Sequence, residues 1–178
     1  DLTASETVKR HFLYVQCLGH YRTNSGYAVR NRRKLHSHLF LYTLQGSGIL
    51  EYADRSLLLT PGTLVLIDCE QIHSYYNSSK ELWDFEWIHF SGGCIDGYLD
   101  EIARNWDKIE LCHAQNRMEE IMKYCEDAGH EHDISCSTAL IHLCSDYLLS
   151  LKKTLGNSVS AYYPFVKDAM DYLQENFA

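Results

Sequence analysis

The sequence predicts an α+β protein in which a β-rich half is followed by an α-rich half. Between residues 11 and 90, short apolar stretches alternate with turns that contain glycine or Pro-Gly, as is typical of strands. From residue 95 onward, apolar residues recur every three or four positions, which is the period of an amphipathic helix. The pair Gly92-Gly93 marks the change between the two patterns.

The β-rich half contains several expected strands. The first four signals run over His38–Gly48, Ile49–Tyr52, Leu64–Asp68 and Gln71–Tyr75, with a Pro-Gly turn at Thr60–Gly62. A longer strand is expected over Glu81–Gly92, where alternation places Trp83, Phe85, Trp87 and His89 on one face and Asp84, Glu86, Ile88 and Phe90 on the other. This aromatic face has two interpretations. It could form one side of a β-sandwich core, or it could form the wall of a pocket for a flat, hydroxyl-rich molecule.

The α-rich half contains three helix signals. Leu99, Ile102 and Ala103 indicate a short helix, and Met118, Ile121, Met122 and Cys125 indicate a second, closed by Gly129. A longer stripe ends at Leu155 and Gly156, with Asp133 or Ser135 as its expected N-cap. Its heptad repeat of Ile134, Ile141, Leu148 and Leu155 suits a helix lying on its own sheet or a dimer seam.

Length and charge limit the function classes. The 178 residues fit one domain, or one domain with a helical appendage. With 24 acidic and 16 basic side chains the net charge is −8, which argues against direct binding of nucleic acid. No stretch approaches the roughly 20 apolar residues of a membrane span, and no signal peptide is visible. The seven scattered cysteines suit a reducing compartment, so we expect a soluble, cytoplasmic protein without a membrane partner.

Catalytic signatures are missing from the sequence. We find no Gly-rich phosphate loop, no Gly-x-Ser-x-Gly elbow and no Cys/His signature that would place a base beside a nucleophile. The neighbouring carboxylates Glu119 and Glu120 fall on a helix face that we expect to be solvated. The sequence therefore favours a binding protein, without a cofactor, over an enzyme.

The order of motifs from about Tyr27 to Gly92 resembles the amino-terminal effector-sensing domain of AraC-type bacterial transcription regulators. The motifs are an arginine, an aromatic-rich strand ending in Gly-x-Gly, a Pro-Gly followed by an apolar run to Asp68, then Ile-His-x-Tyr and Trp-x-Phe-x-Trp-Ile-His-Phe-x-Gly. Residues 163–178 resemble the first helix of that family's DNA-binding domain. The resemblance implies a cupin-like β-barrel, or jelly roll, over 1–93, a helical dimerisation segment over 94–158, and the start of a truncated helix-turn-helix domain over 159–178.

The resemblance also implies a ligand site inside the barrel. Trp87 matches a tryptophan that stacks on the sugar in the arabinose-responsive member, Tyr75 a tyrosine that hydrogen-bonds the ligand, and Arg30 or Arg32 a polar clamp. Phe85 replaces a histidine of that member, which favours another sugar or a less polar effector. An amino-terminal arm, here residues 1–15, closes over the pocket in some relatives. The expected ligand-binding set is Arg30, Arg32, His73, Tyr75, Trp83, Phe85, Trp87 and His89, with Trp83 near the mouth.

We therefore expect the effector-binding part of a transcription regulator, which binds a small molecule such as a carbohydrate, forms a homodimer through the 134–155 helix and reaches DNA only through a further domain. The alternative is a metal-dependent cupin enzyme acting on a sugar or small acid, with His36, His38 and His73 as ligands. Tyr42 and Thr43 stand where its metal-binding glutamate would be, so no metal is expected. A third hypothesis is a ligandless dimerisation scaffold.

Overall fold

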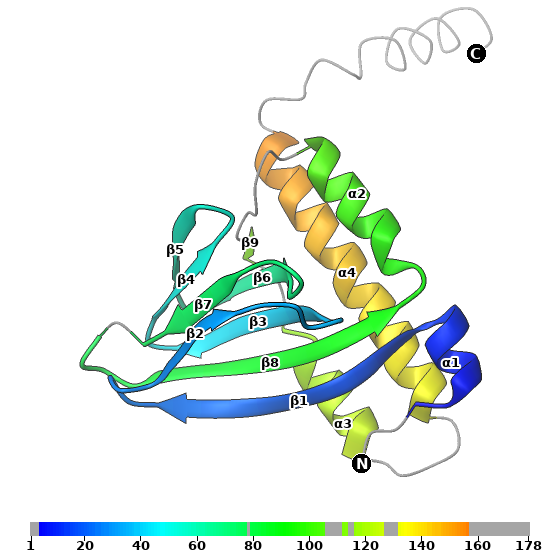
Figure 1. The fold of residues 1–178 in the computed structure, drawn as a ribbon, viewed down its shortest axis with the longest axis horizontal. Helices are drawn as coiled ribbons and strands as arrows, with labels where there is room; N and C mark the ends of the chain where they lie inside the picture. The colour runs from blue at the N-terminus through cyan, green and yellow to red at the C-terminus, as the bar shows by residue number, and fades with distance from the viewer. Residues whose placement is uncertain (1–3, 78, 106–111, 114–115, 127–131, 157–178) are drawn as a thin grey trace, which may run out of the picture.

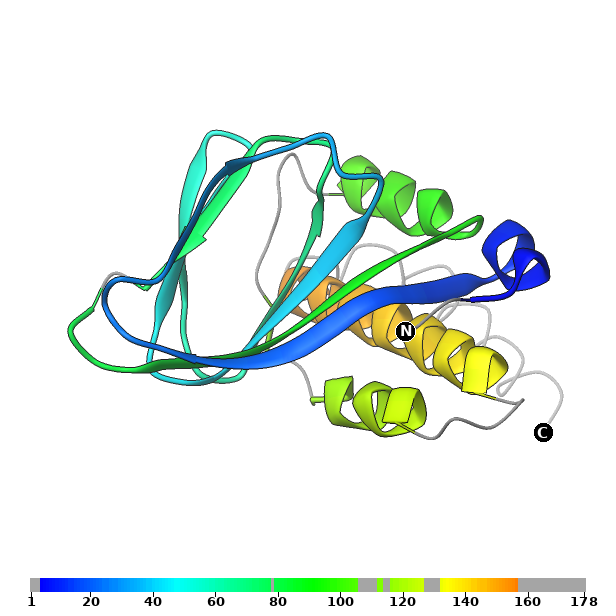
Figure 2. The ribbon, with the colours of Figure 1, turned by 60° about the horizontal axis from the view of Figure 1, so that its bottom comes forward.

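Two antiparallel sheets face one another, and the helices lie against the outer side of the larger sheet (Figures 1 and 2). A computed structural model describes residues 4–77, 79–105, 112–113, 116–126 and 132–156 of the chain. This arrangement confirms the predicted α+β architecture, with strands first and most of the helices after them. The helix expected over residues 163–178, and with it the start of the DNA-binding domain, lies outside the described residues.

The large sheet has five strands and the small sheet four. In spatial order the large sheet contains β1 (Leu13–Thr23), β8 (Trp83–Gly92), β3 (His38–Gln45), β6 (Thr63–Asp68) and β9 (Cys112–His113). The small sheet contains β2 (Ala28–Arg32), β7 (His73–Tyr76), β4 (Gly48–Tyr52) and β5 (Arg55–Leu59). The helices are α1 (Glu6–His11), α2 (Ile95–Asn105), α3 (Met118–Glu126) and α4 (His132–Gly156).

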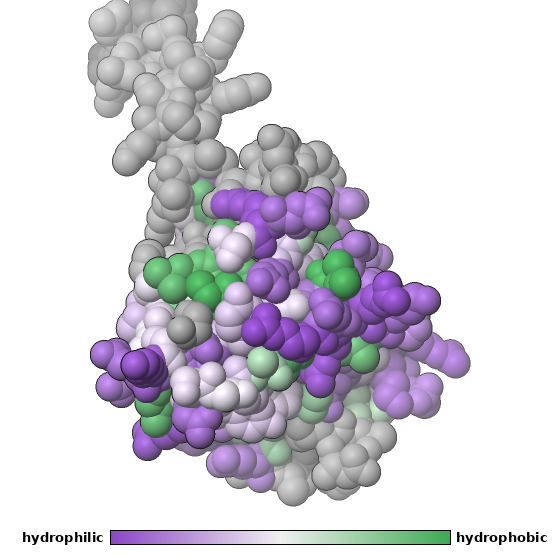
Figure 3. Space-filling view, turned by 60° about the vertical axis from the view of Figure 1, so that its left-hand side comes forward, coloured by the Kyte–Doolittle hydropathy of each residue, from purple (hydrophilic) through white to green (hydrophobic). Residues whose placement is uncertain are grey.

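The large sheet is apolar on both faces, because it separates two hydrophobic cores. Leu39 and Leu41 of β3 face the small sheet, whereas Phe40 between them faces the helices. The same alternation holds in β8, where Trp83 and Phe85 belong to the core between the sheets and Phe90 to the core under the helices. Figure 3 brings the left-hand side of Figure 1 forward. The molecular surface on this side is mostly hydrophilic, with apolar side chains only in small separate groups.

Helix α4 supplies more buried residues to the second core than any other described element. Its buried face carries Cys136, Ala139, Leu140, Leu143, Cys144, Tyr147 and Leu151. The Tyr147 ring meets the Phe40 ring of β3 edge-on at 5.8 Å between centroids. By length and composition, residues Asp133–Lys152 would suffice to cross a membrane, contrary to the sequence expectation. Part of this apolar surface is buried in the core under the sheet, whereas Ile134 and Leu149 remain exposed.

The described residues 4–12 do not form an arm over the space between the sheets. Ser5 caps α1 by accepting a hydrogen bond from the Val8 backbone N–H at 3.3 Å, and Val8 is buried. The Ser5 backbone N–H donates to the carboxylate of Asp133, 3.2 Å away in the first turn of α4. Because α4 begins at His132, Asp133 does not cap it as expected. The described part of the expected arm is therefore held at the helical side of the large sheet.

Gly48 is required by the packing of Trp83, which leads to a prediction about stability. A Cβ at Gly48 would lie 2.5 Å from the buried indole ring, whereas a Cβ at Gly97 in α2 would meet no atom within 4 Å. We expect Gly48→Ala to lower the free energy of unfolding by about 1–3 kcal/mol, because the rigid ring must move in a filled core. The matched control Gly97→Ala should raise it by about 0.5–1 kcal/mol. Urea unfolding measures both, and equal effects would contradict the packing described here.

Candidate ligand-binding pocket

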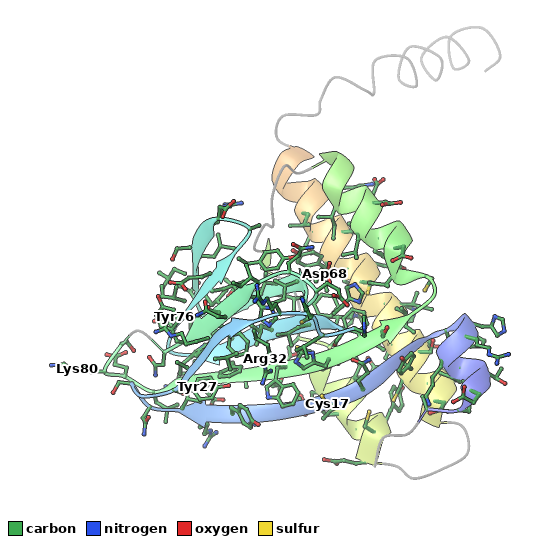
Figure 4. All side chains as sticks on the ribbon, in the orientation of Figure 1. Cys17, Tyr27, Arg32, Asp68, Tyr76 and Lys80 are labelled. Atoms are coloured by element: carbon green, nitrogen blue, oxygen red, sulfur yellow. The ribbon has the colours of Figure 1, made fainter. Side chains whose placement is uncertain are left out.

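A cavity of about 760 Å³ opens between the two sheets, within the size range of small-molecule sites. Its walls come from β1, β2, β7, β8 and the loop that follows β2. The lining residues are Gln16, Cys17, Tyr21, Tyr27, Val29, Arg32, Lys34, Leu35, His36, Ser37, Tyr75, Trp87 and His89. Figure 4 shows Arg32 between Tyr27 and Cys17 on the side of the sandwich turned toward the viewer.

One wall of the pocket is aromatic. The Trp87 ring lies 5.5 Å from the Tyr21 ring, and Tyr27 lies 6.0 Å from Tyr21 and 6.4 Å from Tyr75, all measured between centroids. The Trp87 ring lies against the β1 backbone at Gly19, where a Cβ would lie 2.8 Å from the indole. The buried Nε1–H of Trp87 has no hydrogen-bond partner in the described structure. Trp87 therefore contributes an aromatic ring to the wall of the cavity.

The loop after β2 brings positive charge to the pocket. The cations are Arg32, the last residue of β2, and Lys34 in the loop; both line the cavity and are exposed to solvent, as is the neighbouring His36. The loop is fixed by backbone hydrogen bonds from Lys34 N to Glu70 O at 3.3 Å and from Leu35 N to Cys69 O at 3.2 Å. The side chain of Gln16 in β1 adds a bond from Nε2 to the His36 carbonyl oxygen at 2.9 Å. The backbone that carries these cations is thus held by two other segments.

A bulge decides which of the two expected arginines enters the pocket. The pairing of β2 with β7 shifts between Val29 and Arg32, and Asn31 has a positive φ of 49°. Arg30 and Arg32 therefore do not share a face. The Arg30 guanidinium lies outside, 3.7 Å from the centroid of the Tyr76 ring and 3.9 Å from a Glu51 carboxylate oxygen. Only Arg32 lines the cavity.

His89 lies at the inner wall of the pocket as a neutral group. Its Nδ1 is 2.8 Å from Ser37 Oγ and 3.9 Å from Cys69 Sγ. Burial, followed by the positive charge of Arg32 and by His73, lowers the pKa of His89 to about 4. Burial raises the pKa of the Tyr27 and Tyr75 phenols, so these side chains also stay neutral near pH 7.

The structure brings together four of the eight residues expected to bind the ligand. Arg32, Tyr75, Trp87 and His89 line the cavity. Trp83 was expected near the mouth, but it is completely buried, stacked on Phe85 at 4.0 Å between centroids, and its Nε1 donates to Thr43 Oγ1 at 3.3 Å. His73 is also buried behind the wall, where its Nδ1 lies 2.9 Å from the Gln71 carbonyl oxygen.

Sequence reasoning missed the contribution of β1 to the pocket. Gln16, Cys17 and Tyr21 line it because β1 pairs with β8, which sets Cys17 opposite His89, Gly19 opposite Trp87 and Tyr21 opposite Phe85. The spacing of Cys17, Gly19 and Tyr21 at every second position was a usable signal for a strand face. The partner of that strand, in contrast, depends on distant contacts.

The three histidines of the metal-enzyme alternative do not converge. His36 is exposed and pairs with Glu70. The ring of His38 lies 5.8 Å from that of Phe90, which faces the helices, whereas His73 lies between the sheets. Within the described ranges, no group of three His, Cys, Asp or Glu side chains is arranged to hold a metal ion.

These features define a ligand-binding domain of the cupin-like type. Residues 15–144 match the family described as the AraC-like ligand binding domain, and the chain belongs to this family. The solved structure of ToxT from Vibrio cholerae O395, bound to (E)-4-(8-methylnaphthalen-1-yl)but-3-enoic acid, is similar with a TM-score of 0.51 and 13% identity over 80% of this chain. This likeness confirms the predicted fold class. The chain spans 57% of the length of ToxT.

Smaller parts of the chain are similar to other solved structures. The Cupin_2 domain of an XRE family transcriptional regulator from Enterobacter cloacae has a TM-score of 0.39 and 16% identity, covering 48% of this chain and 84% of that one. A predicted oxalate decarboxylase from Thermotoga maritima has a TM-score of 0.40 and 16% identity, covering 42% and 65%. No curated protein matches the sequence significantly.

The low pKa of His89 predicts a pH dependence of stability. The unfolded chain binds a proton on this residue near pH 6.5, whereas the folded protein does so only near pH 4. Stability contributed by neutral His89 is therefore present above about pH 6.5 and is lost as the pH falls toward 4. Because an ordinary histidine has a pKa of about 6.5, the unfolding free energy should decline between about pH 7 and about pH 5. We expect His89→Gln to reduce this decline, measured by urea unfolding. The exposed-site control His142→Gln should leave the decline unchanged; an unchanged decline in His89→Gln would contradict the argument.

Proposed function

We propose that this chain is the effector-sensing domain of a DNA-binding transcription regulator and that the pocket between its sheets binds the effector. The observation that carries the proposal is the cavity of about 760 Å³ with the Trp87 ring on one wall and polar groups around it. Such a combination of a large apolar surface with a few placed polar groups is typical of small-molecule sites. Membership of a ligand-binding family supports the same conclusion.

The carbohydrate hypothesis is supported by the accessible aromatic wall. The face of Trp87 can make dispersion and C–H contacts to the apolar face of a sugar ring, and the Tyr75 hydroxyl can accept or donate a hydrogen bond. Trp83 and Phe85 shape this wall from behind without lining it. We propose that Arg32, Tyr75, Trp87 and His89 contact the effector directly.

The proposed division of labour assigns ligand binding to residues 1–93, dimerisation to 94–158 and attachment of a DNA-binding domain to 159–178. An effector can change transcription only if it binds two arrangements of the protein unequally. This function belongs to the bacterial cytoplasm, where the DNA lies. The histidine arrangement does not favour the metal-enzyme alternative.

The first test combines a screen of sugars and other small metabolites by thermal shift with variants of the pocket. We expect Trp87→Ala to remain folded and to lose the shift given by any hit, because the substitution removes an indole ring from the wall of the cavity. Tyr75→Phe should weaken binding about tenfold, which corresponds to one lost hydrogen bond.

The neighbouring residue supplies the control for this test. Tyr76 lies next to Tyr75 on β7, but its hydroxyl donates to Glu51 outside the pocket at 3.0 Å. Tyr76→Phe should therefore leave the affinity unchanged. Full binding by Trp87→Ala would contradict the assignment of the pocket.

We propose that the outer face of α4 forms the homodimer seam. Ile134 and Leu149 are 50% and 56% exposed there, and the partly buried Ile141 and Leu148 lie beside them. Leu151 of the same helix, in contrast, is only 1% exposed and belongs to the core. A charge at Leu151 would therefore unfold the protein and say nothing about assembly.

The dimer proposal predicts that Leu149→Glu yields monomers, because a buried unpaired carboxylate is costly at an apolar seam. Leu58→Glu is the matched control, since Leu58 of β5 is 53% exposed in the other sheet. Light scattering coupled to size-exclusion chromatography gives the mass of each variant. A parent protein that is monomeric at micromolar concentration would contradict the seam.

A further inference from the structure

Two cationic side chains line the pocket without making an ion pair in the described part of the chain. Arg32 and Lys34 both line the cavity, and neither makes an ion pair in the described part of the chain. Its described lining contains no Asp or Glu. The carboxylate of Glu70 lies near the rim, but it pairs with His36. Arg32 and Lys34 are therefore cations of the cavity lining without an ion-pair partner among the described residues.

The remaining polar groups of the wall do not offset this charge. The Tyr27 and Tyr75 phenols and the Cys17 thiol keep a raised pKa because of burial, so they remain neutral near pH 7. A neutral sugar brings hydroxyl donors that need acceptors, and a carboxylate of the protein is the strongest acceptor available. This wall lacks that acceptor and is rich in donors.

We propose that the effector carries an anionic group, a carboxylate or a phosphate, which Arg32 and Lys34 bind while the ring or chain of the effector lies on Trp87 and Tyr21. The inference rests on the proposed function of the pocket and narrows its ligand class. A planar guanidinium binds either group through two parallel hydrogen bonds, and the ammonium adds a second charge. The loop backbone that carries both cations is fixed by its bonds to residues 69 and 70, so the anion site is largely formed before the ligand binds.

A pair of fluorescent probes tests this without knowledge of the natural effector. 8-Anilinonaphthalene-1-sulfonate and N-phenyl-1-naphthylamine share a ring system, but only the first is an anion. We expect the folded protein to bind the anionic probe at least about tenfold more tightly, through charge-assisted hydrogen bonds. Its affinity should fall with added salt, because the cations lie in an exposed, screened position.

Substitutions in the pocket test which side chains cause the preference for the anionic probe. Arg32→Gln and Lys34→Gln should each remove most of the preference for the anion while leaving the neutral probe unaffected. Arg30→Gln is the matched control, because it removes the same charge from the same strand but from outside the pocket. Trp87→Ala should weaken both probes.

The outcomes separate the two proposals. Equal affinity for both probes, or an anion preference that survives Arg32→Gln and Lys34→Gln, would overturn the anion site while Trp87-dependent binding still supported an effector pocket. Failure of both probes to bind in a Trp87-dependent way would overturn both. Matched pairs such as D-glucuronate with D-glucose, D-glucose 6-phosphate with D-glucose, and phenylacetate with 2-phenylethanol then distinguish a carboxylate from a phosphate.

Discussion

The pairing of β8 with β1 on one side and β3 on the other is the interaction on which the rest of the structure depends. β8 is buried on both faces, including the charged residues Asp84 and Glu86, because β1 and β3 flank it and other elements cover both of its faces. Its Trp83 and Phe85 join the core between the sheets, and its Ile88 and Phe90 join the core under α4. One strand thereby supplies the wall of the pocket and the surface on which the helices pack.

The same inward face of β8 is a filled core at one end and a pocket wall at the other. At the filled end, Gly48 of the small sheet packs directly against the Trp83 ring, where a Cβ would not fit. Phe85 stacks on the same Trp83 ring. At the open end, Gly19 lets the Trp87 ring lie flat against β1. In both places a glycine faces an indole, because only a residue without a side chain leaves room for the ring. The cavity therefore lies at the Trp87 end of the inward face of β8, whereas the Trp83 end is filled.

The parts of the site that the sequence predicted are those that depend on local pattern. Alternation along 83–90 was sufficient to place Trp87 and His89 on one face, because side-chain direction in a strand has a period of two. Alternation alone could not separate Trp83 from Trp87, since burial depends on what the other sheet covers. It also failed at Asn31, where a bulge turns Arg30 outward and Arg32 inward. The contribution of β1 and of the loop after β2 depends on pairing between distant segments, which one sequence does not show.

The pocket combines wall residues that pack beside the core with exposed residues at its edge. This combination explains how such a pocket can acquire a ligand preference. Trp87 and Tyr75 are parts of strands whose neighbours are core residues, so their replacement affects packing as well as binding. Arg32 and Lys34 are exposed, and their side chains make no ion pair within the described structure. Substitutions there change the charge that a ligand meets with little effect on the core, because surface side chains contribute little to stability. Under the function proposed above, the aromatic wall favours a flat or chain-like molecule, while Arg32 at the end of β2 and Lys34 in the following loop select the charge of that molecule.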